Sequence, residues 1–190
     1  MSEIQKNLVS RRSIYKFSKE KVDEKFLDAA FEAARNAPNH KNTHPWKYYI
    51  IGEKTRDKLI PKVRELSIEK SKKSSNQDIE KGIQRAISKI INPPILIAVT
   101  SALKPEDKFR EEEDYAATVC SLHNFVLSLW GNGIGAQWST GKITRSKETY
   151  AALKIPTKSE RIIGFLKVGY PEKIPTINKK ETDEIRVILP

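Results

Sequence analysis

The feature that most constrains the fold of this chain is the stretch from Tyr115 to Trp130, which is apolar almost all round. The acidic run Glu111 to Asp114 precedes it, and acidic residues in a first turn suit the start of a helix. A helix that is apolar on all sides is buried, either in the core of one chain or between two chains. At about 20 residues it is roughly 30 Å long and would cross a small domain. This length favours an extensive dimer interface.

Shorter apolar segments predict the strands of a sheet. The run from Ile95 to Val99 is continuously apolar and follows two prolines, which is typical of a central strand that is buried on both faces. Aromatic and β-branched residues predict further strands over Trp46–Ile51 and over Arg161–Tyr170. The β-branched segment Ile185–Leu189 is expected to add an edge strand, either to its own subunit or to a partner.

Helical patterns lie between and around these strands. Apolar residues at helical spacing predict a short helix over Glu3–Ser10 and a second helix over Asp23–Arg35, with the aspartate as N-cap. The charged segment Thr55–Ile91 contains two helical patterns, with a break expected over Lys72–Asn76. A further short helix is expected over Lys147–Leu153. Together with the strands, these helices predict an α+β chain.

The composition describes an ordinary folded chain with a basic surface. It has 190 residues, 38% of them hydrophobic and 31% charged, which fits a single domain, 1–190, with no segment biased enough to be disordered. The net charge of +11 favours anionic partners such as nucleotides, phosphorylated cofactors, nucleic acid or acidic membrane surface. The lysines are spread along the chain, however, which favours a solvated basic surface.

Cysteine usage and the N-terminus bear on where the protein works. Cys120 is the only cysteine, so neither an intrachain disulfide nor a cysteine-based metal cluster can form within one chain. This fits a reducing, cytoplasmic setting. The N-terminus lacks the apolar core of a signal peptide, and no stretch approaches 18 uninterrupted apolar residues. We therefore expect a protein that is neither exported nor membrane-spanning.

Hydrogen-bonding residues are concentrated in the segment Ala37–Ile51, APNHKNTHPWKYYII. Pro38 and Pro45 restrict the backbone at both ends of its polar part. Asn39 and Asn42 can bond their own backbone and tolerate unusual φ and ψ. Between the prolines lie several hydrogen-bonding side chains with at least one fixed positive charge. We expect a stiff, shaped loop that faces a polar, anionic neighbour.

Two further motifs predict ligand contacts. Arg11-Arg12-Ser13 combines two guanidinium groups with a hydroxyl, a set suited to a phosphate. Arginines at the end of a helix also interact favourably with its dipole, so a structural role stays open. The segment Gly131–Gly141 ends the long apolar helix, and its glycines supply positive φ or let the backbone approach a ligand. It is not a dinucleotide-binding fingerprint, because it lacks the strand-to-helix context and the final glycine spacing.

In this order, the motifs resemble those of the FMN-dependent nitroreductase family, specifically its compact members that reduce nitro compounds with a nicotinamide cofactor. The resemblance runs from end to end and is carried by RRS at 11–13, APNHKNTHPWKYYII at 37–51, GNGIGAQWSTG at 131–141 and IIGFLKVGYPEK at 162–173. It implies a nitroreductase-like α+β fold, with helices flanking a central, mostly antiparallel sheet, and an intertwined homodimer with FMN at the interface. Residues 55–91 would form a variable helical region near the substrate pocket.

The resemblance assigns cofactor contacts to the N-terminal and C-terminal parts of the chain. Arg11 and Ser13 match positions that hold the phosphate and ribityl side of the flavin, with Arg12 beside them. Lys179 matches a C-terminal cation for the same phosphate, although Lys180 could be the equivalent.

Further contacts are implied in the middle of the chain. His40 and Asn36 match positions that approach the flavin from the other subunit, while a histidine that satisfies local backbone groups remains the alternative for His40. Ser139, Thr140 and Gly141 match the stretch that lies along the cofactor, where small residues and backbone N–H groups are needed for close approach. No side chain is assigned as acid, base or nucleophile, and no metal site is expected.

Some positions depart from the family pattern. Relatives often carry Lys or Arg at the position of Tyr15, near the flavin pyrimidine, where a positive charge favours the anionic reduced flavin. The source of that charge is therefore open. His44 replaces a usual Gln and is interpreted as structural. Trp46, Trp130 and Trp138 are expected to pack in the core and not to stack on the flavin.

The resemblance implies FMN-dependent oxidoreduction. Hydride would pass from NADH or NADPH to flavin N5 and then, after the nicotinamide leaves, to a nitroaromatic, quinone or similar small-molecule electron acceptor in a ping-pong cycle. The nearest enzymatic alternative is flavin fragmentation or reductive dehalogenation. A rival from another class is a basic nucleic-acid-binding module, although the chain has no recognisable nucleic-acid motif. We expect a homodimer with neither nucleic acid nor membrane as partner.

Overall fold

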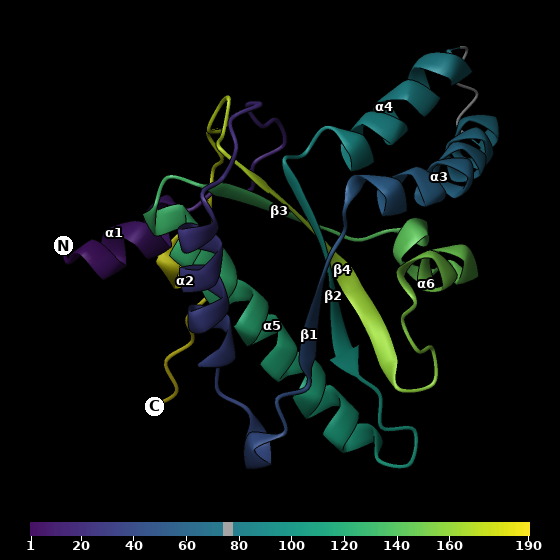
Figure 1. Ribbon diagram of the computed structural model, residues 1–190. Helices are drawn as coiled ribbons and strands as arrows, with labels where there is room; N and C mark the ends of the chain where they lie inside the picture. Colours follow the sequence, from purple (N-terminus) through teal and green to yellow (C-terminus); the bar gives the residue numbers. More distant parts are fainter. Residues whose placement is uncertain (74–77) are drawn as a thin grey trace.

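A sheet lies at the centre of the molecule. The computed structural model describes residues 1–73 and 78–190, and within them four antiparallel strands pair in the order β1-β2-β4-β3 (Figure 1). The strands are β1 (Trp46–Ile50), β2 (Ile95–Ala102), β3 (Gly135–Ser139) and β4 (Glu160–Gly169). The predicted strands β1, β2 and β4 are confirmed, and β2 is central as expected. Strand β3 was not predicted, because its glycine-containing sequence was interpreted only as an approach to a ligand.

Helices cover both faces of the sheet. They are α1 (Glu3–Ser10), α2 (Glu24–Arg35), α3 (Glu53–Lys73), α4 (Ile79–Ile91), α5 (Lys108–Gly131) and α6 (Lys147–Leu153). Three short 3-10 turns are η1 (His40–Asn42), η2 (Lys142–Arg145) and η3 (Thr182–Glu184). The side chain of Asp23 accepts from the Lys25 N–H, which confirms the predicted N-cap of α2. The predicted α+β class is confirmed.

The two faces of the sheet carry separate apolar cores. On one face α2 and α5 pack on the sheet, with Phe125, Leu129 and Leu166 at the centre, all at most 1% exposed. On the other face, which α3, α4 and α6 cover, the core contains Leu59 of α3, Phe165 of β4 and neighbouring residues (Figure 1). The β-strands alternate between these cores, since successive side chains of a strand point to opposite faces.

Helix α5 differs from the prediction in one respect. It is buried along one side, but Tyr115 is 37% exposed and both Cys120 and His123 lie on the open side. Within one chain, then, the helix is not buried all round. The apolar character of its open side leaves the second predicted option, burial between two chains.

One predicted boundary is wrong, and one predicted strand is not formed within the chain. Helix α3 continues through Lys73, two residues into the predicted break, and residues 74–76 of that break lie outside the described residues. The segment Ile185–Leu189 forms no strand with its own chain, and its apolar side chains are 73% to 84% exposed. Strand propensity needs a free edge to pair with, so the option of a strand within its own subunit is wrong, while pairing with a partner subunit stays a prediction. In the part of the chain that the structure describes, no helix is both long and apolar enough to cross a membrane.

Candidate functional site

The predicted phosphate-binding segment lies along strand β3. Ser13 forms a parallel bridge with Ala136, and the Ile14 N–H donates to the Ala136 carbonyl over 3.0 Å. Ile14 is fully buried and lies so close to Gly135 that a Cβ on this glycine would be 2.3 Å from Ile14 Cγ1. The glycine therefore allows close approach of the chain's own N-terminal segment, where the sequence had predicted approach to a ligand or positive φ. The positive φ occurs at Gly133 instead, at 74°.

The two arginines of the motif have different surroundings. The Arg12 guanidinium donates to the carbonyls of Val9 and Arg11, both over 2.9 Å, which is the structural role that the sequence left open. Arg11 caps α1 through its backbone N–H and is half-buried. Among the described residues its guanidinium has no carboxylate partner. Arg11 is thus the arginine that remains available to an anion.

His123 of α5 lies within electrostatic range of Arg11. Partial burial, together with the positive charge of Arg11, lowers the pKa of His123. The sequence analysis assigned no role to this histidine. Its only signal was a polar residue within an otherwise apolar helix.

The other end of β3 carries the residues predicted to lie along the cofactor. Ser139 is the last residue of the strand, and its hydroxyl donates to the Phe165 carbonyl over 3.3 Å. Thr140 and Gly141 follow in exposed positions, and a Cβ on Gly141 would meet no heavy atom within 4 Å. Because Ser13 pairs three residues before Ser139, the two predicted groups lie roughly 10 Å apart along one strand. The structure brings them together.

The Pro38–Pro45 loop is the second region that was predicted to contact the cofactor, and side chains of helix α5 hold it in place. His40 Nδ1 lies 2.9 Å from both carboxylate oxygens of Glu113. Arg110 Nη2 donates to the His40 carbonyl over 2.6 Å, and the Thr43 hydroxyl donates to Asp114 over 2.8 Å. His40 therefore makes its contact with a helix carboxylate and not with local backbone, contrary to the alternative considered for it. The hydrogen bond from His40 lowers the pKa of Glu113, and the charge of Arg110 adds to this.

The backbone of this loop is strained. Lys41, Asn42 and His44 have φ values of 53°, 51° and 45°, a region that costs a residue with a side chain about 1 kcal/mol or more. The Asn39 side chain accepts from the His44 N–H over 3.0 Å, which confirms the predicted backbone bonding of this asparagine. A loop that holds several such residues is a shaped one, as expected, and its contacts with α5 maintain the shape.

One buried carboxylate at this loop keeps an unused oxygen. Asp114 is 1% exposed, and its Oδ1 lies 3.4 Å from Arg110 Nε. Its Oδ2 is the buried side-chain atom without a hydrogen-bond partner within the described residues. Asp114 also lines a hollow of about 230 Å³ with His44, Lys47 and other polar residues.

The structure does not bring all predicted site residues together. Asn36 ends α2, where its side chain donates to the Glu32 carbonyl over 2.8 Å, and Lys179 is exposed in the C-terminal segment. The loop contacts helix α5 at Glu113. Helix α1 contacts α5 at Leu127, where the Asn7 side chain donates to the Leu127 carbonyl over 3.0 Å. These two positions of α5 are roughly 20 Å apart along the helix axis. Within one chain, the two regions belong to opposite ends of α5.

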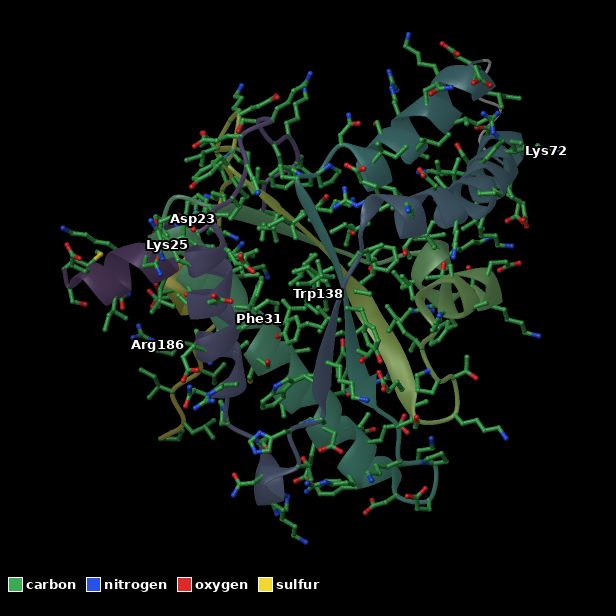
Figure 2. All side chains as sticks on the ribbon, viewed as in Figure 1. Asp23, Lys25, Phe31, Lys72, Trp138 and Arg186 are labelled. Atoms are coloured by element: carbon green, nitrogen blue, oxygen red, sulfur yellow. The ribbon has the colours of Figure 1, made fainter. Side chains whose placement is uncertain are left out.

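The tryptophans fit the packing prediction unequally. Trp46 and Trp130 are half-buried, and Trp130 Nε1 donates to the Ser10 hydroxyl over 2.9 Å. Trp138 lies on the sheet (Figure 2), where its indole covers Gly164 and donates to the Ile163 carbonyl over 3.2 Å. It remains 39% exposed, so the prediction of a core position is wrong for this residue.

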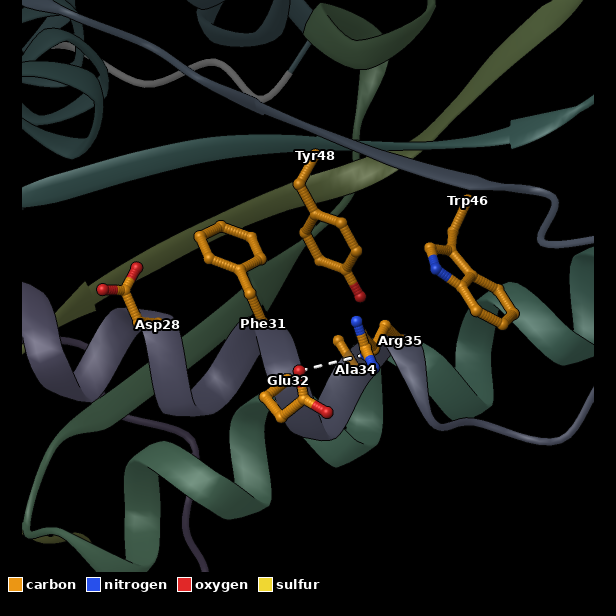
Figure 3. Close-up of a pocket in the computed structure, with 7 residues that line it drawn as sticks. All are labelled: Asp28, Phe31, Glu32, Ala34, Arg35, Trp46 and Tyr48. Carbon is orange, nitrogen blue, oxygen red and sulfur yellow. Dashed lines mark ion pairs between the residues drawn. The ribbon is translucent and has the colours of Figure 1, made fainter.

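A larger hollow lies between α2 and β1 and is separate from the predicted cofactor residues. It measures about 330 Å³ and is lined by Asp28, Phe31, Glu32, Ala34, Arg35, Trp46 and Tyr48 (Figure 3). The aromatic rings of Phe31 and Tyr48 meet edge to face with centroids 5.5 Å apart, and Glu32 pairs with Arg35 over 3.0 Å. The predicted site residues are not among its walls. Among the described residues, no group of three His, Cys, Asp or Glu side chains could hold a metal ion.

Comparison with known proteins defines the class. The model of the nitroreductase family matches residues 8–170, which include β3, the Arg11–Ser13 segment and the Pro38–Pro45 loop. This chain therefore belongs to the nitroreductase family of oxidoreductases.

Individual relatives agree with this class. The "Putative NAD(P)H nitroreductase YfhC" of Bacillus subtilis (strain 168) is 31% identical over 172 residues, covering 90% of this chain and 86% of the relative. The solved nitroreductase-like family protein from Bacillus cereus is 28% identical, with a TM-score of 0.78 over 99% of this chain and 97% of the other. A structure from Desulfovibrio desulfuricans described as a putative nitroreductase in complex with FMN shares the fold, with 18% identity and a TM-score of 0.76 over 100% and 98% of the two chains.

Proposed function

We propose that this chain is an FMN-dependent oxidoreductase that transfers hydride from NADH or NADPH to a nitroaromatic, a quinone or a similar electrophile. The observation that supports the proposal is the pairing of Ser13 with Ala136, which brings the segment that contains Arg11 beside β3, the strand that ends two residues before the open backbone of Gly141. FMN in the solved relative and NAD(P)H in the name of the Bacillus subtilis relative support it.

The residues along β3 fit a phosphorylated flavin. The Arg11 guanidinium and the Ser13 hydroxyl are donors for the phosphate and ribityl side, and Lys179 or Lys180 would add a further cation. The exposed backbone at Thr140 and Gly141 leaves room for a flat ring. When bound, FMN supplies the hydride acceptor and donor, in two half-reactions that share one position over the ring. The protein binds and orients it, and residues 55–91 would shape the acceptor pocket.

The proposal includes a homodimer in which each FMN is completed by both chains. The two predicted regions lie roughly 20 Å apart along α5 within one chain. In a dimer, His40 and Asn36 of one chain would approach the FMN that is held by Arg11 and Ser13 of the other. The exposed side of α5 around Tyr115, and the exposed apolar tail at Ile185–Leu189, supply surface for such an interface. We place this single-domain enzyme in the cytoplasm, in line with its one cysteine.

The first experiment is spectroscopic. The purified protein should be yellow, or should take up added FMN, and should elute from a calibrated sizing column as a dimer. Steady-state assays with both nicotinamides and a panel of nitroaromatics, quinones and enones would then rank donors and acceptors. A colourless protein that does not take up FMN contradicts the proposal. If the same preparation bound duplex DNA with an affinity that falls steeply with salt, this would support the nucleic-acid-binding alternative.

A further inference from the structure

A lysine is buried inside the sheet. Lys167 of β4 is 6% exposed and lies on the α3–α4 face, where its strand neighbour Leu96 and the nearby Phe165 belong to the apolar core. Its Nζ donates to Gln137 Oε1 on β3 over 3.1 Å. An ammonium group has three donors, and lysines are rarely buried without an anionic partner.

The surroundings of Lys167 contain no compensating charge. Among the described residues, no carboxylate pairs with Lys167 or with Lys89, the nearby lysine of α4. Burial and, to a smaller extent, the like charge of Lys89 lower the pKa of Lys167 to about 8. An anion placed within reach of this ammonium would relieve both effects. The arrangement is that of a cation that stabilises a charge supplied from outside the chain.

The position of Lys167 relates it to the proposed cofactor site. Gln137, which holds Lys167, directly follows Ala136, the residue that pairs with Ser13. After Ser13 the N-terminal segment crosses the start of β3 and the end of β4, because a Cβ on Gly135 would be 2.3 Å from Ile14 Cγ1 and a Cβ on Gly169 would be 3.2 Å from Phe17 Cβ. Tyr15 is 65% exposed and occupies the position where the family resemblance implies a cation near the flavin pyrimidine. Gln137 and Lys167 form the next pair on the same face as Gly135 and Gly169, so Lys167 lies beside the segment in which this chain lacks that cation.

We propose that Lys167, held by Gln137, supplies the positive charge that stabilises reduced FMN, in place of the cation that Tyr15 replaces. This inference rests on the proposed function. The reduced flavin is an anion, so a nearby ammonium favours it over the neutral oxidised ring and raises the midpoint potential. Because Lys167 is buried, salt screens its charge less than that of a surface lysine.

The test compares midpoint potentials of the FMN-loaded protein. In Lys167→Gln, the affinity for reduced FMN relative to oxidised FMN should fall about tenfold, which for a two-electron couple is about 30 mV towards more negative potential. Lys167→Arg keeps the charge and should retain most of the parent potential. Lys158→Gln removes an equal charge from an exposed position and serves as the matched control, with an unchanged potential. The affinity for oxidised FMN should change less than twofold in Lys167→Gln.

A second measurement does not depend on the variants folding. The pKa of Lys167, followed by NMR of isotope-labelled lysine, should rise when bound FMN is reduced, since the anion stabilises the ammonium form. Equal midpoint potentials in the parent and in Lys167→Gln, or a Lys167 pKa that does not change when FMN is reduced, would overturn the assignment of Lys167 and leave the proposed function intact. Failure of the parent to bind FMN would overturn both.

Discussion

The β3 edge and the Pro38–Pro45 loop are both predicted to meet the cofactor, but they use their charged groups in opposite ways. At the β3 edge, Arg11 in the adjacent N-terminal segment and Lys167 on the neighbouring strand β4 have no carboxylate partner within the described residues. At the loop, His40 pairs with Glu113 of α5, and the Arg110–Asp114 pair within α5 contacts the loop through the His40 carbonyl and the Thr43 hydroxyl. Unpaired buried or half-buried cations indicate a place for an external anion, whereas paired charges indicate a fixed shape. We therefore expect the β3 edge to bind the cofactor and the loop to hold a fixed shape.

This difference predicts that substitutions in the two regions affect different quantities. Changes in the loop, or in the α5 residues that contact it, should lower the free energy of unfolding more than the affinity for FMN. Changes on β3 should do the reverse. The variants below are ordered from the largest expected effect to the smallest.

Arg110→Ala should have the largest effect, and it should act on stability. Its guanidinium reaches Asp114, Glu113 and the His40 carbonyl, and its loss leaves the buried Asp114 carboxylate without a cation. We expect the free energy of unfolding to fall by about 3 kcal/mol, as measured by urea denaturation of the apoprotein. Arg85→Ala, at an exposed position of α4, is the control and should stay within about 0.5 kcal/mol of the parent. A larger loss of FMN affinity than of stability in Arg110→Ala would break the comparison.

Arg11→Ala should act mainly on binding. Loss of a charge-assisted hydrogen bond to phosphate costs about 1.5–3 kcal/mol, so the Kd for FMN should rise about 10- to 100-fold in a titration followed by flavin fluorescence. The free energy of unfolding of the apoprotein should change by less than about 1 kcal/mol, because Arg11 has no carboxylate partner among the described residues. Equal flavin affinity in parent and variant, with Arg85→Ala again as control, would exclude Arg11 from the phosphate site.

The smallest effect is expected from Glu113→Gln and depends on pH. The folded state lowers the pKa of Glu113 below its ordinary value of 4.5, chiefly through the hydrogen bond from His40. A lowered folded pKa stabilises the protein above the unfolded pKa, and this contribution disappears as the pH falls through the folded value. The parent should therefore be more stable than the variant above pH 4.5, and the difference should vanish in more acidic solution. Urea denaturation over a pH series measures it, and a difference that is constant with pH would show that the pair does not stabilise the loop.

Much of the fold could be predicted from the sequence, because the signals act over a few residues. Asp23 caps α2 as expected, and the apolar run from Ile95 to Val99 forms a central strand. Strand β3 was missed, since glycine and tryptophan in a short segment carry no alternation that identifies a strand. The C-terminal segment was predicted to add a strand to its own subunit or to a partner, and the first option is wrong because β-branched residues alone do not supply an edge to pair with.

The candidate site was predictable in part. The motifs at Arg11–Ser13 and at Ser139–Gly141 were predicted as separate cofactor contacts, and the structure shows that Ser13 pairs with β3, the strand that ends at Ser139. The roles of Arg110 and Lys167 were not recognised. A charged residue at the start of a helix and a lysine in a strand are ordinary in a sequence, and only their neighbours make them unusual.

The sequence by itself determined the approximate positions of strands β1, β2 and β4 and of the helices around them, and that this chain carries the motifs of the nitroreductase family. Caps, prolines and apolar periodicity are local properties, so they can be recognised without knowledge of the tertiary structure. Only the tertiary structure decided that Ser13 lies against Ala136, that Lys167 is buried beside Gln137, and that His40 of the loop pairs with Glu113 of α5. Burial and charge compensation depend on which distant segments lie side by side, and the packing of the sheet sets that arrangement.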